Sequence, residues 1–450
     1  MLLRFAVSNF LSISEEIDFT LFPYTRLRDK KSHIYQTPGV DLLKVAAVYG
    51  ANGSGKSNLV KAMGCLRDFV LFGDLLKSQQ IIGPFRLSEE LIGQPSVMEI
   101  EFFHSGTYYS YELSASRNQV YTEVLSITYP PGERREVLFS RTVKEGKPSL
   151  TFAPRYQQSE EDRARINIYV NELLTPTASL LTVLARNDAF PELQQVAEWF
   201  RNRFLVIQPN DVFSNFAEVL YLDTEFAAFA LNLLKTLDTG ITDITLERMT
   251  YDTFFGLDAE AQKREALAAL NQGVDYLKVT VYGEVMLLKL EEGELMVYRA
   301  LFIHETADGV PIKFSVREES DGTRRVLDFL PVWRTLKSEA AAVVIDEVGR
   351  SLHPKLLEQL IQIFMTQPMT GQLIFTTHED ALLSQELFRR DEIHLLNKTK
   401  AGNSEVYPLS DFKKARHDTD LRKNFLFGRF GGTPRITPYF SLEQRAAAYE

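Results

Sequence analysis

The stretch VAAVYGANGSGKS, residues 45–57, decides the fold of this chain. Its first five residues are apolar, which is typical of a short strand buried in a parallel sheet. The glycine run that follows fits the pattern Gly-x4-Gly-Lys-Ser, in which successive backbone N–H groups point at a phosphate. Apolar residues from Leu59 to Val70 then recur at helical spacing, so a helix is predicted to begin at Ser57. The stretch predicts a strand, a phosphate-binding loop and a helix.

The residue types of this loop suit a nucleoside triphosphate and its metal ion. Lys56 supplies a point charge between the β- and γ-phosphates, and the Ser57 hydroxyl is suited to ligate Mg²⁺. A flexible glycine turn without nucleotide is the alternative, which the strand before the loop and the helix after it disfavour. The predicted ATP contacts are Gly50, Asn52, Gly53, Ser54, Gly55, Lys56, Ser57 and Asn58.

An acidic pair follows a second apolar stretch, AAAVVIDE at residues 340–347. Asp346 ends a predicted strand over 343–345, and a carboxylate at the carboxyl edge of a parallel sheet reaches Mg²⁺ beside the phosphate loop. Glu347 is expected to orient and polarise the water that attacks the γ-phosphate. Two adjacent acids at a strand end also serve as helix caps, so the catalytic interpretation depends on the other signals.

Two further signals flank the acidic pair. The sequence ESDGT, residues 319–323, precedes a predicted helix whose N-terminus carries partial positive charge. Ser320 and the Gly322 N–H are therefore expected to bind a γ-phosphate held by a second copy of the chain, although the same residues form ordinary helix caps. His378 follows a predicted strand over 373–375 and is expected to contact the γ-phosphate or the attacking water. A lone histidine is equally compatible with a surface or core position.

The order of these signals predicts a site completed between two copies. The phosphate loop, the Ser320–Gly322 pair, the acidic pair and His378 follow one another along the chain. The sequence SLHP, residues 351–354, occupies the position of a dimer-contact loop, and its proline suits the first turn of a helix. A glutamine that contacts the metal is not assigned, and Gln94 is the only candidate that we consider.

Secondary-structure signals divide the chain into three parts. Residues 1–155 combine N-terminal strands, the phosphate loop and a β-meander over 97–152. Residues 156–275 indicate a mainly helical insertion, whose phenylalanines are expected to form its own core or an interface. Residues 276–450 return to strands and complete the nucleotide fold. We therefore expect an α/β protein, with a mixed sheet around a P-loop core, an antiparallel β-subdomain and a helical insertion.

Composition limits the classes of partner and compartment. The 450 residues are 45% hydrophobic with a net charge of -10, so a globally basic nucleic-acid surface is not expected. The single cysteine, Cys65, excludes an internal disulfide and fits a reducing cytosol. No signal peptide is recognised, and the longest apolar runs are too short to cross a bilayer. We expect a cytoplasmic protein with no membrane contact.

These motifs resemble those of ABC-type ATPases related to SMC, RecF and the OLD family. The resemblance covers about residues 1–150 and 280–440 and includes DEVGRSLHP at 346–354 and TTHEDALL at 376–383, with RRD at 389–391. The segments YPLSDF at 407–412 and GRFGGTP at 428–434 resemble the C-terminal part of RloA-like ATPases and of the ATPase subunit of the PARIS anti-phage system. The resemblance implies an ABC-type ATPase head of a prokaryotic defence protein.

The same resemblance implies partners. Such ATPases pair as homodimers or larger homo-oligomers through their heads and control a separate effector, often a nuclease of the TOPRIM type. A nuclease site within this chain is not expected, because the late Asp418-Thr-Asp420 follows a charged run instead of a strand. A RecF- or SMC-like clamp on DNA and a scaffold that hydrolyses ATP slowly remain open hypotheses.

The tail over 411–435 is locally basic, with interleaved phenylalanines. It is predicted either to bind a nucleic acid or an acidic partner, or to be a solvated, partly packed tail. The residues concerned are Lys413, Lys414, Arg416, Arg422, Lys423, Arg429 and Arg435, with Phe425, Phe427 and Phe430.

Overall fold

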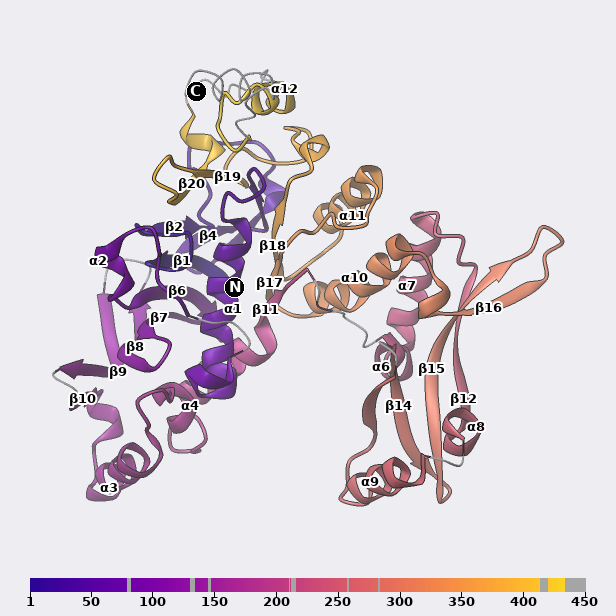
Figure 1. Ribbon diagram of the computed structural model, residues 1–450, viewed down its shortest axis with the longest axis horizontal. Helices are drawn as coiled ribbons and strands as arrows, with labels where there is room; N and C mark the ends of the chain where they lie inside the picture. Colours follow the sequence, from indigo (N-terminus) through magenta and orange to yellow (C-terminus); the bar gives the residue numbers. More distant parts are fainter. Residues whose placement is uncertain are drawn as a thin grey trace, which may run out of the picture. The chain divides into compact units, whose positions relative to one another are not determined.

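The computed structural model describes residues 1–78, 82–129, 134–144, 147–209, 211, 216–256, 259–281, 284–412 and 420–433 (Figure 1). The chain forms two compact units. Unit 1 consists of Met1–Pro209, Glu339–Val348 and Thr370–Glu450, and unit 2 consists of Asn210–Ser338 and Gly349–Met369. Each unit is therefore assembled from more than one segment, and the segments of unit 1 are far apart in the sequence.

A six-stranded, mostly parallel sheet forms the centre of unit 1, in the order β11-β17-β18-β5-β19-β20. All neighbouring pairs are parallel except β19 and β20. Strands β5, β17 and β18 are buried along their full length, which explains their continuous apolar sequences. The strands are β5 (Val45–Tyr49), β11 (Phe204–Ile207), β17 (Ala342–Ile345), β18 (Gln372–Thr377), β19 (Ile393–Lys398) and β20 (Ser404–Pro408).

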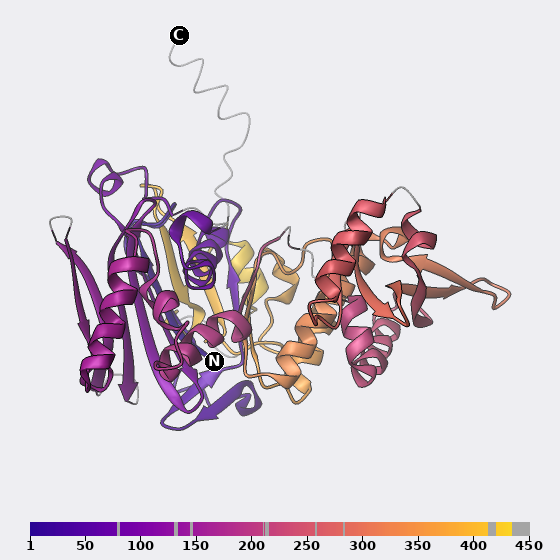
Figure 2. The same ribbon diagram turned by 90° about the horizontal axis from the view of Figure 1, so that it is seen from below.

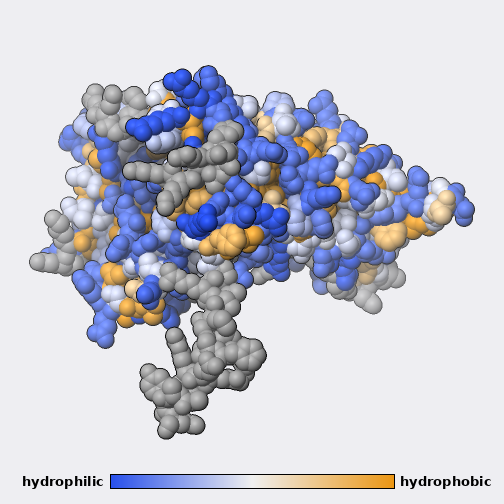
Figure 3. All heavy atoms as spheres, turned by 90° about the horizontal axis from the view of Figure 1, so that it is seen from above, coloured by the Kyte–Doolittle hydropathy of each residue, from blue (hydrophilic) through white to orange (hydrophobic). Residues whose placement is uncertain are grey.

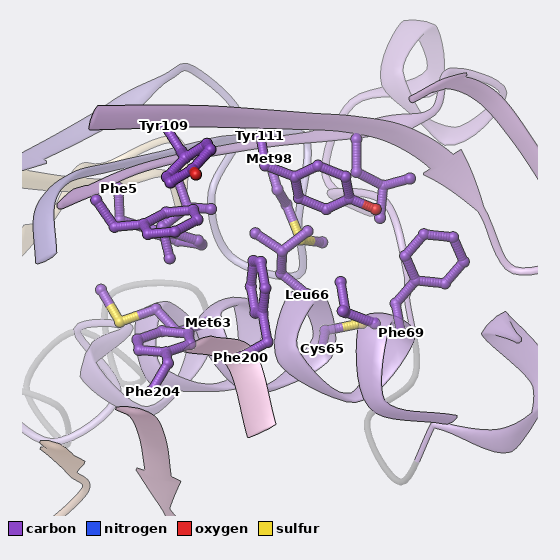
Figure 4. Close-up of a cluster of buried hydrophobic side chains, with 14 of the residues drawn as sticks. Phe5, Met63, Cys65, Leu66, Phe69, Met98, Tyr109, Tyr111, Phe200 and Phe204 are labelled. Carbon is purple, nitrogen blue, oxygen red and sulfur yellow. The ribbon is translucent and has the colours of Figure 1, made fainter. Parts of the chain in front are cut away.

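A seven-stranded sheet packs beside this core, in the order β10-β9-β8-β7-β6-β1-β2. Its strands are β1 (Leu2–Ser8), β2 (Ile17–Thr20), β6 (Ser96–His104), β7 (Thr107–Ser116), β8 (Gln119–Tyr129), β9 (Arg134–Lys144) and β10 (Lys147–Phe152), all paired antiparallel. Helix α1 (Lys56–Phe72) buries its apolar face against this sheet (Figure 4). Met63, Leu66 and Phe69 of α1 share this core with Phe5 of β1 and Tyr111 of β7.

The remaining elements of unit 1 are short. They are the hairpin β3 (Ile34–Thr37) and β4 (Val40–Leu43), and helices α2 (Glu89–Ile92), α3 (Glu160–Ile168), α4 (Leu180–Leu184), α5 (Pro191–Glu198) and α12 (Leu421–Leu426). Figures 1 and 2 show the C-terminal strands β19 and β20, in yellow, beside N-terminal strands in indigo. Strands from the N-terminal and C-terminal parts of the chain, including β2 and β20, therefore lie side by side in unit 1.

Unit 2 is built around a second antiparallel sheet, β12-β15-β14-β13, with β16 paired to β15. Its strands are β12 (Asp243–Thr250), β13 (Leu277–Val281), β14 (Glu284–Glu291), β15 (Glu294–Glu305) and β16 (Pro311–Ser315). Its helices are α6 (Phe216–Leu222), α7 (Thr224–Thr236), α8 (Tyr251–Phe255), α9 (Glu260–Leu270), α10 (Asp321–Ser338) and α11 (Pro354–Thr366). Unit 2 thus contains the predicted helices at 323–337 and 354–365.

The predicted P-loop core with an antiparallel β-subdomain is confirmed. The helical character of residues 156–275 is confirmed only in part, because the segment also contains β11 and β12. Its phenylalanines do not form one core: Phe200 and Phe204 pack in unit 1, whereas Phe216 and Phe226 are buried in unit 2. The expected divisions at 155 and 275 do not coincide with the division between the units, because units are set by which segments bury one another and not by local composition.

No described helix is long and apolar enough to cross a bilayer. On the face shown in Figure 3, hydrophilic side chains predominate and hydrophobic ones form small separate patches.

One buried side chain joins the three sheets of unit 1. The amide of Gln372, at the start of β18, accepts a hydrogen bond from the Leu2 N–H at 2.6 Å and donates to the carbonyls of Leu2 and Leu43, each at 3.0 Å. Gln372 is fully buried, so no water can replace these bonds. It therefore fixes β1 and β4 against the parallel sheet.

We predict that Gln372→Leu lowers the free energy of unfolding by about 2–4 kcal/mol, because it leaves three buried backbone groups without this partner. Denaturant unfolding followed by circular dichroism measures the change. Gln362→Leu, at an exposed position of α11, is the matched control and is expected to change stability by less than about 0.5 kcal/mol. An equal effect of both substitutions would contradict this role for Gln372.

Candidate functional site

The phosphate loop lies between β5 and α1, as the sequence predicts. Gly53 and Gly55 have positive φ angles of 76° and 113°, which side chains rarely adopt. A Cβ atom on Gly50 would lie 2.5 Å from the Leu396 carbonyl oxygen, so this position is closed to any larger residue. The glycines are therefore required by the shape of the loop, which turns its backbone tightly ahead of α1.

Lys56 is the first residue of α1 and is only 7% exposed. Its Nζ donates to the carbonyls of Gly50 at 2.7 Å and Ala51 at 3.1 Å. Burial lowers the pKa of Lys56 from its ordinary value, while the negative charges of Asp346 and Glu347 act in the opposite direction. The structure therefore brings Lys56 and the acidic pair into one electrostatic environment.

Two serines from distant segments support the back of the phosphate loop. The Ser404 hydroxyl donates to the Ser54 carbonyl at 2.7 Å and lies 2.8 Å from the Ser12 hydroxyl. Asn58 of α1 donates to the same Ser12 hydroxyl at 2.7 Å. Sequence analysis missed both serines, because neither belongs to a recognisable pattern and 392 positions separate them.

The acidic pair follows β17 and is held in place by Thr376 of β18. The Thr376 hydroxyl donates to Asp346 Oδ1 at 2.5 Å and accepts the Glu347 N–H at 2.8 Å. Glu347 has a φ of 51°, a left-handed conformation that costs a non-glycine residue on the order of 1–3 kcal/mol. Thr376 therefore stabilises a strained turn that sets the directions of both carboxylates, and it is a third residue whose role sequence analysis missed.

The residues present fit a magnesium ion. Asp346 is fully buried, and its Oδ2 has no hydrogen-bond partner among the described residues. A buried carboxylate oxygen without a partner is costly unless a cation or another donor compensates it. Ser57, the second residue of α1, supplies a hydroxyl at the phosphate loop. Oxygen ligands of this kind are those that Mg²⁺ prefers.

His378 completes this edge of the sheet. It is exposed and directly follows β18, which lies between β17 and β5. Because these three strands are parallel, the phosphate loop, the acidic pair and His378 all lie at the same carboxyl edge. The tertiary structure thus gathers the predicted residues Gly50, Asn52–Asn58, Asp346, Glu347 and His378 in unit 1.

Ser320 and Gly322 belong to unit 2, at the N-terminus of α10. The exposed Ser320 hydroxyl accepts the Thr323 N–H at 3.0 Å and lies 2.8 Å from the Thr323 hydroxyl, so it caps the helix. A Cβ atom on Gly322 would lie 3.2 Å from the Ser351 carbonyl, which places the predicted dimer-contact loop beside it. Pro354 is the first residue of α11, as predicted, and His353 caps that helix by accepting the Lys355 N–H.

The other sequence-level candidates have structural roles or remain unassigned. Gln94 is exposed, and its backbone carbonyl accepts from the Asn9 amide. Arg389 is fully buried and forms a bidentate pair with Asp391, at 2.9 and 2.7 Å. Neither observation assigns these residues a role in nucleotide binding.

The basic tail is only partly within the described residues, since 413–419 and 434–450 lie outside them. Within the described part, Phe425 and Phe430 are buried, and Phe427 is 68% exposed. Arg422 of α12 donates to Asp380 at 2.6 Å. This part of the tail therefore packs on unit 1, which favours the partly packed alternative for 420–433.

The chain matches a known protein family over most of its length. Residues 45–384 match the model of the family described as "AAA domain, putative AbiEii toxin, Type IV TA system". A search of curated proteins finds no match.

Three solved structures are similar at low identity. The SMC head domain from Thermotoga maritima is 12% identical, with a TM-score of 0.37, 90% of this chain covered and 98% of that one. The SmcHead bound to the C-winged helix domain of ScpA is 13% identical, with a TM-score of 0.38 and coverages of 90% and 96%. The Smc head domain with an extended coiled coil bound to the C-terminal domain of ScpA, derived from Pyrococcus furiosus, is 12% identical, with a TM-score of 0.37 and coverages of 91% and 97%. We infer nothing about the site from similarity at this level.

The family model spans the phosphate loop, the acidic pair and His378, and it covers more than half of the chain. The chain belongs to this family of AAA ATPase domains.

Proposed function

We propose that this chain binds and hydrolyses ATP as the sensor subunit of a bacterial anti-phage defence complex of the abortive-infection type. In this proposal, ATP-dependent pairing of two heads controls a separate toxic effector, a nuclease. The observation that carries the ATPase part is the buried Oδ2 of Asp346, which has no hydrogen-bond partner in the described part of the chain and lies at the same sheet edge as Lys56 and Glu347. The family description, which names a toxin of a toxin–antitoxin system, supports the defence part.

In this proposal, each predicted site residue of unit 1 has a distinct role in ATP hydrolysis. Lys56, now donating to two loop carbonyls, would transfer those hydrogen bonds to phosphate oxygens and neutralise their charge. Asp346 and Ser57 would hold Mg²⁺, which supplies charge stabilisation to the phosphates when bound. Glu347 would orient and polarise the attacking water, and His378 would contact the γ-phosphate or that water. Lys56 would thus stabilise the negative charge of the phosphates, and Glu347 would activate the water that attacks them.

Pairing of two copies would supply contacts to the γ-phosphate that unit 1 does not itself provide. Ser320 and Gly322 lie at the N-terminus of an 18-residue helix, where backbone N–H groups and the helix dipole favour an anion. In the proposal they bind the γ-phosphate held by a second copy. The chain passes from unit 1 to unit 2 between Val348 and Gly349, directly after the acidic pair, so a change at Glu347 has a short covalent route to unit 2. ATP must bind the paired state more tightly than the unpaired one to act as a switch.

A RecF- or SMC-like DNA clamp is the second candidate, and one observation favours it. Arg26, Arg28 and Lys31 are exposed on one loop of unit 1 and form no ion pair with a described residue. Such a cluster suits phosphate backbones despite the acidic net charge. ATP-stimulated DNA binding by the isolated protein that weakens steeply with salt would select the clamp over the effector-controlling subunit.

We predict that Lys56→Ala and Glu347→Gln each reduce ATP turnover at least about a hundredfold, because they remove charge stabilisation and water activation respectively. Lys56→Ala is also expected to weaken ATP binding, whereas Glu347→Gln retains it. Phosphate release and equilibrium ATP binding measure the two effects. Lys61→Ala, on the same helix, is the control and should behave as wild type. Full turnover in both site variants would refute the assigned chemistry.

Thr376→Val is predicted to lower turnover about tenfold or more and to raise the Mg²⁺ concentration needed for half-maximal rate, because both hydrogen bonds that orient the acidic pair are lost. Thr376→Ser keeps the hydroxyl and should restore both values to within about threefold of wild type. A magnesium titration of ATP turnover distinguishes this positioning role from simple destabilisation. If valine and serine behave alike, the hydroxyl is not what positions the acids.

Mixing two inactive variants tests completion of the site between copies. Lys56→Ala and Ser320→Arg should each be inactive alone, yet a mixed pair retains one intact site. Random pairing makes half of the pairs mixed, so up to about a quarter of wild-type turnover is expected after mixing. ATP turnover of the mixture, compared with each variant alone, is the measurement. No recovery, with pairing verified by light scattering, would argue against a shared site.

A further inference from the structure

We propose that the nucleoside half of the nucleotide binds in a cavity between the phosphate loop, the β19–β20 hairpin and the C-terminal segment 428–433. This inference rests on the proposed ATPase function and adds to it the part of the chain that holds the ribose and base. The cavity lies wholly within unit 1.

The strand order fixes the direction of a bound triphosphate. β5, which carries the phosphate loop, lies between β18 and β19. The residues suited to hydrolysis, Asp346, Glu347 and His378, all follow β17 and β18, on one side of β5. The γ-phosphate must face that side for attack to occur, so the chain of phosphates leaves the loop towards β19.

A cavity of about 710 Å³ lies on that side of the loop. Its walls include the loop residues Asn52–Ser54, the hairpin residues Asn397, Glu405 and Tyr407, and Gly431 of the C-terminal segment. This volume is within the range of roughly 300–1,000 Å³ that is typical of small-molecule sites. The cavity is therefore continuous with the phosphate loop and large enough for a nucleoside.

The side chains around the cavity suit a nucleotide. Lys398 and Lys400 line it, are exposed and form no ion pair with a described residue, so their charges are available to phosphate oxygens. Glu405, half-buried on β20, offers a carboxylate of the kind that accepts hydrogen bonds from ribose hydroxyls. Two cations and a carboxylate around a cavity beside the phosphate loop match the charges that a nucleoside triphosphate needs, since its phosphates are anionic and its sugar carries hydroxyl groups.

Asn397 makes the wall of the cavity rigid. Its side-chain amide donates to the Tyr407 hydroxyl and accepts the Gly432 N–H. The C-terminal segment also packs against the loop itself, since a Cβ atom on Gly432 would lie 3.7 Å from the Gly50 Cα atom. Phe425 of α12 contacts Tyr49 of β5 edge-on, with ring centroids 6.1 Å apart. The tail residues therefore form part of the nucleotide site and are not merely an extension beyond it.

Filling the cavity tests the inference. The Glu405→Trp variant places a large side chain in it from β20, where an aromatic residue suits the strand. Thr433→Trp fills it from the C-terminal segment, and Ser149→Trp, at an exposed position of β10 outside the cavity, is the control. Equilibrium binding of ATP is compared with binding of inorganic tripolyphosphate, which lacks the nucleoside. Lys56→Ala, which should weaken both ligands, tests the phosphate loop separately.

The expected result is that Glu405→Trp weakens ATP at least about tenfold, or ~1.4 kcal/mol, and leaves tripolyphosphate within about twofold. Retention of wild-type ATP affinity by both tryptophan variants would overturn the inference. An equal loss of affinity for ATP and tripolyphosphate in both tryptophan variants would overturn it as well. The substitutions would then disturb the phosphate loop and not a site for the nucleoside. Unchanged binding of both ligands in Lys56→Ala would instead count against the proposed function.

Discussion

The parallel pairing of β18 between β17 and β5 is the constraint on which the site depends. Strand β5 begins at residue 45 and β17 at residue 342, yet the register of β18 with both strands aligns their carboxyl ends. Loops that follow neighbouring parallel strands must emerge at the same edge. The phosphate loop, the acidic pair and His378 therefore meet because of backbone hydrogen bonds, and Thr376 of the middle strand then orients the acidic pair.

This edge holds several unfavourable features together. Lys56 is buried with a lowered pKa, Asp346 has a buried oxygen without a partner among the described residues, and Glu347 has a left-handed backbone. Features of this kind gathered at one edge of a sheet are typical of functional sites. The surrounding core offsets their cost: the fully buried Trp199 stacks on Phe102 with ring centroids 3.9 Å apart, and on Phe204 at 5.0 Å. A nucleotide with its metal would relieve the uncompensated charge.

The two units divide the predicted machinery. Unit 1 holds the loop, the acids and the histidine, and unit 2 holds Ser320, Gly322 and the loop beside Ser351. The chain crosses directly after Val348, so the strained Glu347 lies two residues from the other unit. In the proposed switch, this short segment would connect the site of hydrolysis to unit 2. Nucleotide binding can transmit a signal only if it favours one of two states of the protein. Within unit 1, Arg422 of the tail pairs with Asp380, two residues beyond His378.

The sequence alone determined the local secondary structure around the site and the identity of most of its residues. Residues 45–57 carried enough pattern to predict β5, the loop and α1, and the acidic pair and His378 were recognisable because each follows an apolar strand. Local patterns could not reveal the roles of Ser12, Ser404 or Thr376, because each hydroxyl forms its hydrogen bonds with a segment that is distant in the sequence. Nor could composition show that residues 156–275 supply Phe200 to unit 1 and Phe226 to unit 2, since burial depends on contacts between distant segments. The tertiary structure alone decided which side of the loop has room for a nucleoside, because that cavity is bounded by residues more than 300 positions apart.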